Sequence, residues 1–147
     1  MNPKLNPQRF PFIRDAYNPF FNRVFYWYTS WLFHRRFQAV WLDNSCHPPG
    51  SRSVLFIGNH NSWWDGLIPL VLNERIYKLK GRAMMDEEQL RKHLFFRQLG
   101  TFSINRSHPR KAIRSLQYAA SLINNAKEGA GIGLWMYPEG KLVSPET

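Results

Sequence analysis

The sequence has little cysteine and no long apolar run, and both shortages narrow what the protein can be. Cys46 is the only cysteine among 147 residues, which excludes an internal disulfide and favours a reducing compartment. A membrane-spanning helix needs about 20 consecutive apolar residues, whereas the most apolar stretch, residues 20–33, is interrupted by Asn22, Arg23 and Ser30. The start of the chain is rich in proline and has no apolar core, so no secretory signal is expected.

Acidic residues are scarce relative to basic ones, and the formal net charge is +10. This excess favours an anionic partner such as nucleic acid, anionic lipid or a phosphorylated substrate. The basic residues are spread from Lys4 to Lys141 without forming a run, which is more typical of a solvated surface. A nucleic-acid surface would interleave basic and aromatic side chains. Because the aromatic residues instead concentrate before residue 43, no nucleic-acid partner is expected.

The segment 20–42 contains neither Gly nor Pro and predicts a helix with an aromatic face. The members of this face are Phe20, Val24, Trp27, Tyr28 and Trp31. Trp and Tyr favour the headgroup layer of a bilayer, so one interpretation is a helix lying on a membrane surface. In the alternative interpretation, the helix packs on its own domain and these aromatic side chains are part of the core. The scarcity of aliphatic residues in this segment favours the membrane-surface interpretation. The expected lipid contacts are Trp27, Trp31, Arg35 and Arg36.

Beyond residue 45, short apolar runs alternate with helical segments, which is typical of an α/β domain with a largely parallel sheet. The predicted strands are 53–58, 76–85, 102–105 and 134–137, and the predicted helices are 62–74, 86–99 and 107–129. Asp86 and Ser107 are expected to be helix caps. The last helix is expected to bury Ile113, Leu116, Ala120 and Ile123. The domain organisation predicted is an arm with a surface helix over 1–45 and a second unit over 46–147.

His60 and Asp65 follow the first strand and are candidates for acid–base chemistry. Five residues apart, they would point about 140° away from each other on a continuous helix. They meet only if His60 lies in the turn and Asp65 in the first turn of a helix capped by Ser62. A carboxylate bonded to one imidazole nitrogen leaves the other as a base. Alternatively, Asp65 only caps the helix. No metal is expected, because no further ligand lies at suitable spacing.

Two further turns at strand ends carry charged residues. Arg106 follows one strand and precedes a helix, where it can fork onto a phosphate or form a surface ion pair. Glu139 lies in a Tyr-Pro-Glu-Gly turn after the last predicted strand. Taken alone, this segment predicts only a turn. In open α/β sheets, ligands bind at this edge.

Together and in this order, these segments resemble three sequence blocks of the glycerolipid (lysophospholipid) acyltransferase family, which includes 1-acylglycerol-3-phosphate acyltransferases. Residues 59–65 look like its His-x4-Asp block, and residues 100–106 look like its second block. Residues 137–140 look like its third block, which is usually Phe-Pro-Glu-Gly. The resemblance covers about residues 50–140.

The resemblance implies that His60 is a general base and that Asp65 orients it. Arg106, Glu139 and Gly140 would hold the polar head of the acceptor. The donor would be an acyl-carrier protein or coenzyme A thioester, with no other cofactor. The hydroxyl of a lysophospholipid or related glycerolipid would attack it directly. A peripheral position on the cytoplasmic face of a membrane is then expected.

The chain also departs from the family pattern. Residues 141–143 are Lys-Leu-Val where the family usually has Thr-Arg-Ser, and residues 84–86 stand where it often has lysines. Relatives continue through a fourth block, so the catalytic domain is expected to be shortened at its C-terminus. The first two departures weaken lysophosphatidate in particular as the implied acceptor. The departure around Lys141 and the shortened C-terminus favour the alternative that the chain is a non-catalytic membrane- or lipid-binding module of the same fold, whereas the intact His60/Asp65 pair opposes it.

Overall fold

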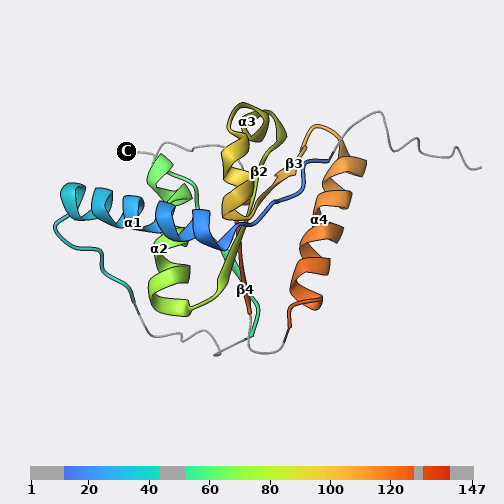
Figure 1. Ribbon diagram of the computed structural model, residues 1–147. Helices are drawn as coiled ribbons and strands as arrows, with labels where there is room; N and C mark the ends of the chain where they lie inside the picture. Colours follow the sequence, from blue (N-terminus) through green and yellow to red (C-terminus); the bar gives the residue numbers. More distant parts are fainter. Residues whose placement is uncertain (1–11, 44–51, 128–130, 140–147) are drawn as a thin grey trace, which may run out of the picture.

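Parallel strands form the centre of the fold in the computed structural model, which describes residues 12–43, 52–127 and 131–139 (Figure 1). Within these ranges the sheet has four strands in the order β1-β4-β2-β3, and every neighbouring pair is parallel. The strands are β1 (Val54–Ile57), β2 (Lys80–Asp86), β3 (Thr101–Ile104) and β4 (Ile132–Met136). The predicted α/β class with a parallel sheet is confirmed.

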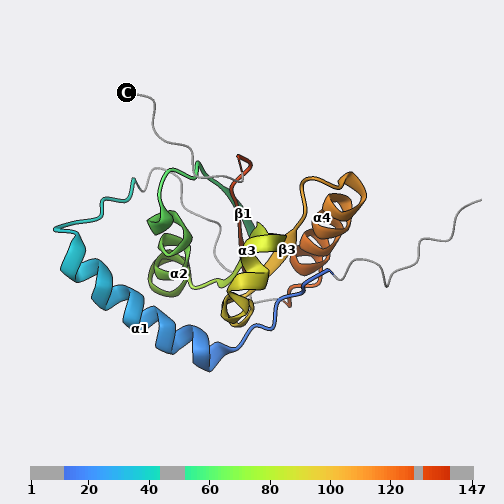
Figure 2. The ribbon, with the colours of Figure 1, turned by 90° about the horizontal axis from the view of Figure 1, so that it is seen from above.

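Helical segments connect and cover the strands, as parallel pairing requires. Among the described residues they are α1 (Pro19–Arg36), the 3₁₀ turn η2 (Trp63–Gly66), α2 (Ile68–Leu72), the π-helical turn η3 (Asn73–Tyr77), α3 (Glu87–Lys92), the 3₁₀ turn η4 (Leu94–Leu99) and α4 (Pro109–Asn124). Figure 2 shows α2 on one side of the sheet, with α1 outside it, and α4 on the other side.

Two elements differ from the predicted boundaries. β2 begins later than expected, because the helical turn after α2 continues through Tyr77, whose ring stacks on Phe56 of β1 at 5.0 Å and 22°. The helix predicted from Asp86 breaks at His93 into α3 and η4. The predicted boundary at residue 45 lies outside the described residues, as do Cys46 and Gly129, and the division into two units stays a prediction.

α1 ends at Arg36, whereas the helix was predicted to reach residue 42. Its basic last turn suits the partial negative charge at a helix C-terminus. Phe37 then adopts an extended conformation, and its ring packs edge-on against Trp64 of η2 at 4.9 Å. This tertiary contact ends the helix without a Gly or Pro.

α1 packs on the domain through Asn22, Thr29 and Phe33 and turns its aromatic face to solvent. Asn22 and Thr29 are buried, and the Asn22 side-chain amide donates a 2.6 Å hydrogen bond to Glu74 of η3. The aromatic face is at least half exposed at every position: Phe20, Val24, Trp27, Tyr28 and Trp31. The alternative in which these side chains form core is therefore wrong. Among the described residues, no helix combines the length and apolar character needed to cross a bilayer.

The buried face of α4 coincides only in part with the predicted one. Ser115 and Ala119 are buried against the sheet, and the Ser115 hydroxyl donates to the Ser103 carbonyl of β3 at 2.8 Å. Small side chains allow this close approach of helix and strand. Of the residues expected in the core, Ile113, Leu116 and Ala120 are exposed, whereas Ile123 is half-buried and packs against the core. The residue before the helix is His108, so the predicted cap at Ser107 is also wrong.

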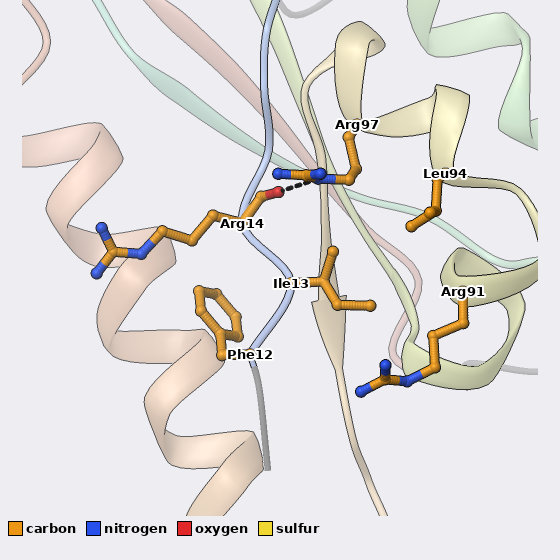
Figure 3. A pocket seen from close by; sticks show the side chains of 6 residues that line it. All are labelled: Phe12, Ile13, Arg14, Arg91, Leu94 and Arg97. Atoms are coloured by element: carbon orange, nitrogen blue, oxygen red, sulfur yellow. Dashed lines mark hydrogen bonds between the residues drawn. The ribbon is translucent and has the colours of Figure 1, made fainter. Parts of the chain in front are cut away.

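The segment before α1 runs along the outer edge of β3, where it covers backbone groups that an edge strand leaves unpaired. The Ser103 N–H donates to the Ile13 carbonyl at 2.9 Å, and the Ile13 N–H donates to the Ser103 hydroxyl at 3.0 Å. Phe12 packs edge-on against Tyr118 of α4. A shallow hollow of about 530 Å³ lies between this segment, α3 and η4 (Figure 3), and Arg97 bridges it by donating to the Arg14 carbonyl.

A buried ion pair anchors the same segment to β2. Asp15 lies 3.1 Å from Arg82, measured from Oδ2 to Nε, and it also accepts the hydroxyl hydrogen bond of Tyr118. Burial, together with the hydrogen bond to Asp15 and the charge of that carboxylate, raises the pKa of Tyr118 to about 12. The hydroxyl of Tyr118 is therefore a neutral donor at physiological pH.

Gly100 closes η4 in the left-handed region, with φ of 91°. A Cβ at this position would lie 2.4 Å from the Gly81 carbonyl oxygen of β2. We expect Gly100→Ala to lower the free energy of unfolding by about 1–3 kcal/mol, because both the backbone conformation and the contact are strained. Denaturant unfolding measures the change.

Gly66→Ala is the matched control, because nothing lies within 4 Å of a Cβ built at Gly66. Its stability should change much less. Equal losses for the two variants would contradict a special requirement for glycine at position 100.

Candidate active site

The predicted site residues meet at the carboxyl ends of β1, β3 and β4. His60 follows β1, Arg106 follows β3, and Glu139 follows β4. β4 lies directly beside β1 in the sheet, so the turns after these two strands are neighbours. This is the edge at which open α/β sheets bind ligands.

His60 and Asp65 adopt the arrangement that their spacing requires. Ser62 precedes η2, Asp65 lies in the first turn, and the Nδ1 atom of His60 lies 3.4 Å from Asp65 Oδ2. The same carboxylate oxygen accepts hydrogen bonds from the backbone N–H groups of Asn61 and Ser62, both at 2.7 Å. The side chains of His60 and Asp65 are 25% and 21% exposed, so solvent and substrate can reach them. A proton on Nδ1 would face Asp65 and would leave Nε2 as the basic nitrogen.

Tyr137 is a member of this site to which the sequence analysis assigned no role. Its ring stacks on the His60 ring with centroids 4.9 Å apart and 27° between the planes. Its hydroxyl donates to the Asp65 backbone carbonyl. Burial, together with the charge of the Asp65 carboxylate, raises the pKa of Tyr137 well above its usual value, so the hydroxyl stays a neutral donor. The signal in the sequence was its place directly before Pro-Glu-Gly.

Glu139 connects the turns after the three strands. Its carboxylate accepts a hydrogen bond from the His60 backbone N–H at 3.3 Å, and its backbone carbonyl accepts one from Arg106 at 3.0 Å. The Pro-Glu-Gly turn therefore contacts both of the other predicted blocks. Gly140, the remaining predicted site residue, lies outside the described residues.

A polar cluster supports the segment that carries Arg106. Glu87, at the start of α3, accepts hydrogen bonds from Asn105 at 2.9 Å and from Arg91 at 2.7 Å, and it lies 3.7 Å from Lys111 of α4. Burial opposes ionisation of Glu87, but the hydrogen bonds from Arg91 and Asn105 and the charges of Lys111 and Arg91 outweigh it and lower the pKa of this carboxyl. The ionised Glu87 therefore ties the end of β3 to α3 and α4.

The predicted lipid contacts do not belong to this site. Trp27, Trp31, Arg35 and Arg36 all lie on α1, where the Arg35 guanidinium sits 5.1 Å above the Trp31 ring. Within the described ranges, no group of three or more His, Cys, Asp or Glu side chains is placed to hold a metal ion.

Comparison with protein-family models identifies the family of the chain. The acyltransferase family model matches residues 36–147, which include His60, Asp65, Arg106 and Glu139. No curated protein and no solved structure shows a significant match to the chain. The family match covers most of the chain and every strand that builds the site. The chain therefore belongs to the acyltransferase family of the 1-acylglycerol-3-phosphate acyltransferase type.

Proposed function

We propose that the protein transfers a fatty acyl group from an acyl-carrier protein or coenzyme A thioester to the hydroxyl of a lysophospholipid or related glycerolipid. Family membership supports acyl transfer in general. The observation that carries the finer proposal is the contact of His60 with Asp65 beside Glu139 and Arg106.

In the proposed mechanism, Asp65 accepts the Nδ1 proton of His60 in a hydrogen bond, and Nε2 removes the proton of the acceptor hydroxyl. The hydroxyl oxygen attacks the thioester carbonyl, and a new ester bond forms as the carbon–sulfur bond breaks. The departing thiolate takes the proton back from the imidazolium. Ser62 is not a nucleophile in this scheme, because its backbone N–H and hydroxyl both face the Asp65 carboxylate.

Arg106 is the proposed contact for the phosphate of the acceptor. It lies just before the N-terminus of α4, where backbone N–H groups and the helix dipole favour an anion. The first turn of α4 contains no acidic residue that would compete for this position. The Glu139 carbonyl, which accepts the Arg106 hydrogen bond, aligns the guanidinium with the catalytic pair.

A membrane surface is the proposed source of the acceptor, at the cytoplasmic face. The exposed aromatic face of α1, flanked by Arg23, Arg35 and Arg36, supports a peripheral, interfacial contact. A lipid acceptor would then reach the site without leaving the headgroup region.

His60→Ala should reduce kcat by at least the roughly 10²–10⁴-fold that a positioned general base contributes. Stability should barely change, because His60 lies in a partly exposed loop. Release of free thiol from an acyl thioester, in the presence of a lysophospholipid, measures the rate. Unchanged turnover would refute the proposed mechanism.

Asp65→Asn should also reduce kcat strongly, because it alters the hydrogen bond that sets the His60 tautomer while it keeps the shape of the side chain and most of the helix cap. Since the pair acts as one unit, the double variant should be little worse than His60→Ala alone. Losses that multiply would mean that Asp65 acts separately, as a helix cap. Circular dichroism of each variant controls for unfolding.

Arg106→Ala should raise KM for a phosphate-bearing acceptor far more than KM for the thioester donor, because the removed guanidinium faces only the acceptor in the proposed complex. Steady-state kinetics with each substrate varied in turn measure the two constants. Arg114→Ala is the control for loss of one positive charge from α4, and it should alter neither constant. Equal effects of Arg106→Ala on both substrates would assign it a structural role.

Replacing Trp27 and Trp31 with serine should reduce binding to vesicles containing anionic phospholipid, because both side chains are more than half exposed on the aromatic face. Binding should also fall at high salt, which screens the flanking arginines. Co-sedimentation with vesicles measures both effects. Trp63→Ser removes an exposed tryptophan from another element and is the control. If neither the α1 substitutions nor high salt reduces vesicle binding, the proposed membrane contact of α1 is wrong.

A further inference from the structure

Tyr137 contacts both members of the candidate catalytic pair, and it does so through different parts of its side chain. The ring lies almost parallel to the His60 ring, at a centroid distance of 4.9 Å. The hydroxyl reaches past that ring and donates to the Asp65 backbone carbonyl. One side chain from the end of β4 thereby spans the turn after β1 and the first turn of η2.

The ring contact has a consequence for the charge that His60 acquires. The face of an aromatic ring is electron-rich and attracts a cation placed over it. An imidazolium formed on His60 would lie over this face. Besides Tyr137, the Asp65 carboxylate contacts His60 at Nδ1, and the Glu139 carboxylate accepts a hydrogen bond from its backbone N–H.

The hydroxyl contact of Tyr137 bears on the position of Asp65. The Asp65 carboxylate is directed at His60 only while the first turn of η2 keeps its position, and the Tyr137 hydroxyl binds the carbonyl of that same residue. Because the raised pKa of Tyr137 keeps the hydroxyl protonated, this donor is present across the range in which a histidine changes its charge.

We propose that Tyr137 is a positioning residue with two separable roles: its ring stabilises the His60 imidazolium, and its hydroxyl holds Asp65 in place. The proposal rests on the function of His60 as the general base. It goes beyond what the resemblance to the third sequence block implies. The usual first residue of that block is phenylalanine, which has a ring but no hydroxyl.

Two substitutions separate the roles. Tyr137→Phe keeps the ring and removes the hydroxyl, so kcat should fall by about 3–10-fold, the size of one hydrogen bond, while the acidic limb of the pH–rate profile stays where it is. Tyr137→Leu removes both contacts. Its kcat should fall further, and its acidic limb should move to lower pH by about half a unit, because the imidazolium loses the ring that stabilises it.

Tyr77 provides the matched control, because it stacks on Phe56 in the same sheet at a similar distance but has no contact with His60. Tyr77→Leu should lower the melting temperature without moving the acidic limb. Tyr137→Met serves as a second apolar variant if Tyr137→Leu does not fold, and the same shift is expected of it.

The experiment measures kcat against pH by thiol release for the wild type, the Tyr137 variants, Tyr77→Leu and His60→Ala. The proposal is overturned if an apolar variant at position 137 leaves the acidic limb unmoved, or if Tyr137→Phe moves it as far. His60→Ala distinguishes this failure from that of the proposed function. If His60→Ala retains turnover, the assignment of His60 as general base is wrong. If His60→Ala loses turnover but the acidic limb of the pH–rate profile does not move in the Tyr137 variants, only the role of Tyr137 is wrong.

Discussion

The candidate site depends on the carboxylate of Asp65. One of its oxygens accepts the backbone N–H groups of Asn61 and Ser62 and also faces Nδ1 of His60. A single negative charge therefore shapes the turn after β1 and orients the imidazole. The sequence posed a helix cap and a catalytic partner as alternatives for Asp65, but the geometry meets the requirements of both at once. Removal of this carboxylate would disturb structure and proposed chemistry together.

The order of the strands places the rest of the site around that carboxylate. β4 is last of the described strands in the chain but lies beside β1, so Tyr137 and Glu139 reach a turn formed far earlier in the sequence. Arg106 arrives from β3 and is held by the Glu139 carbonyl. Glu87 in turn fixes the segment before Arg106 through Asn105. The turn after β4 is thus the junction of the site.

Two helices show how far periodicity predicts which face is buried. The favoured interpretation placed the aromatic face of α1 outward, and that face is exposed. Of the α4 residues expected in the core, Ile113 and Leu116 are exposed, whereas Ile123 packs against the core. The fully buried positions of the two helices are mostly polar or small, namely Asn22, Thr29, Ser115 and Ala119, together with Phe33. For α1, a buried hydrogen bond between Asn22 and Glu74 holds the polar side inward. For α4, small side chains permit contact with β3, which larger ones would prevent.

The sequence by itself determined the parallel α/β class, the strand ends that carry the site, and the turn that lets His60 meet Asp65. These are local properties, set by apolar runs, by turn residues and by the geometry of a helix N-terminus. Only the tertiary structure decided where α1 ends, which helix faces are buried, and that Tyr137 joins the site. Each of these depends on a contact between distant segments: Phe37 with Trp64, Ser115 with Ser103, and Tyr137 with His60 and Asp65. Local propensity contains no information about such partners, because their energies exist only once the sheet has assembled.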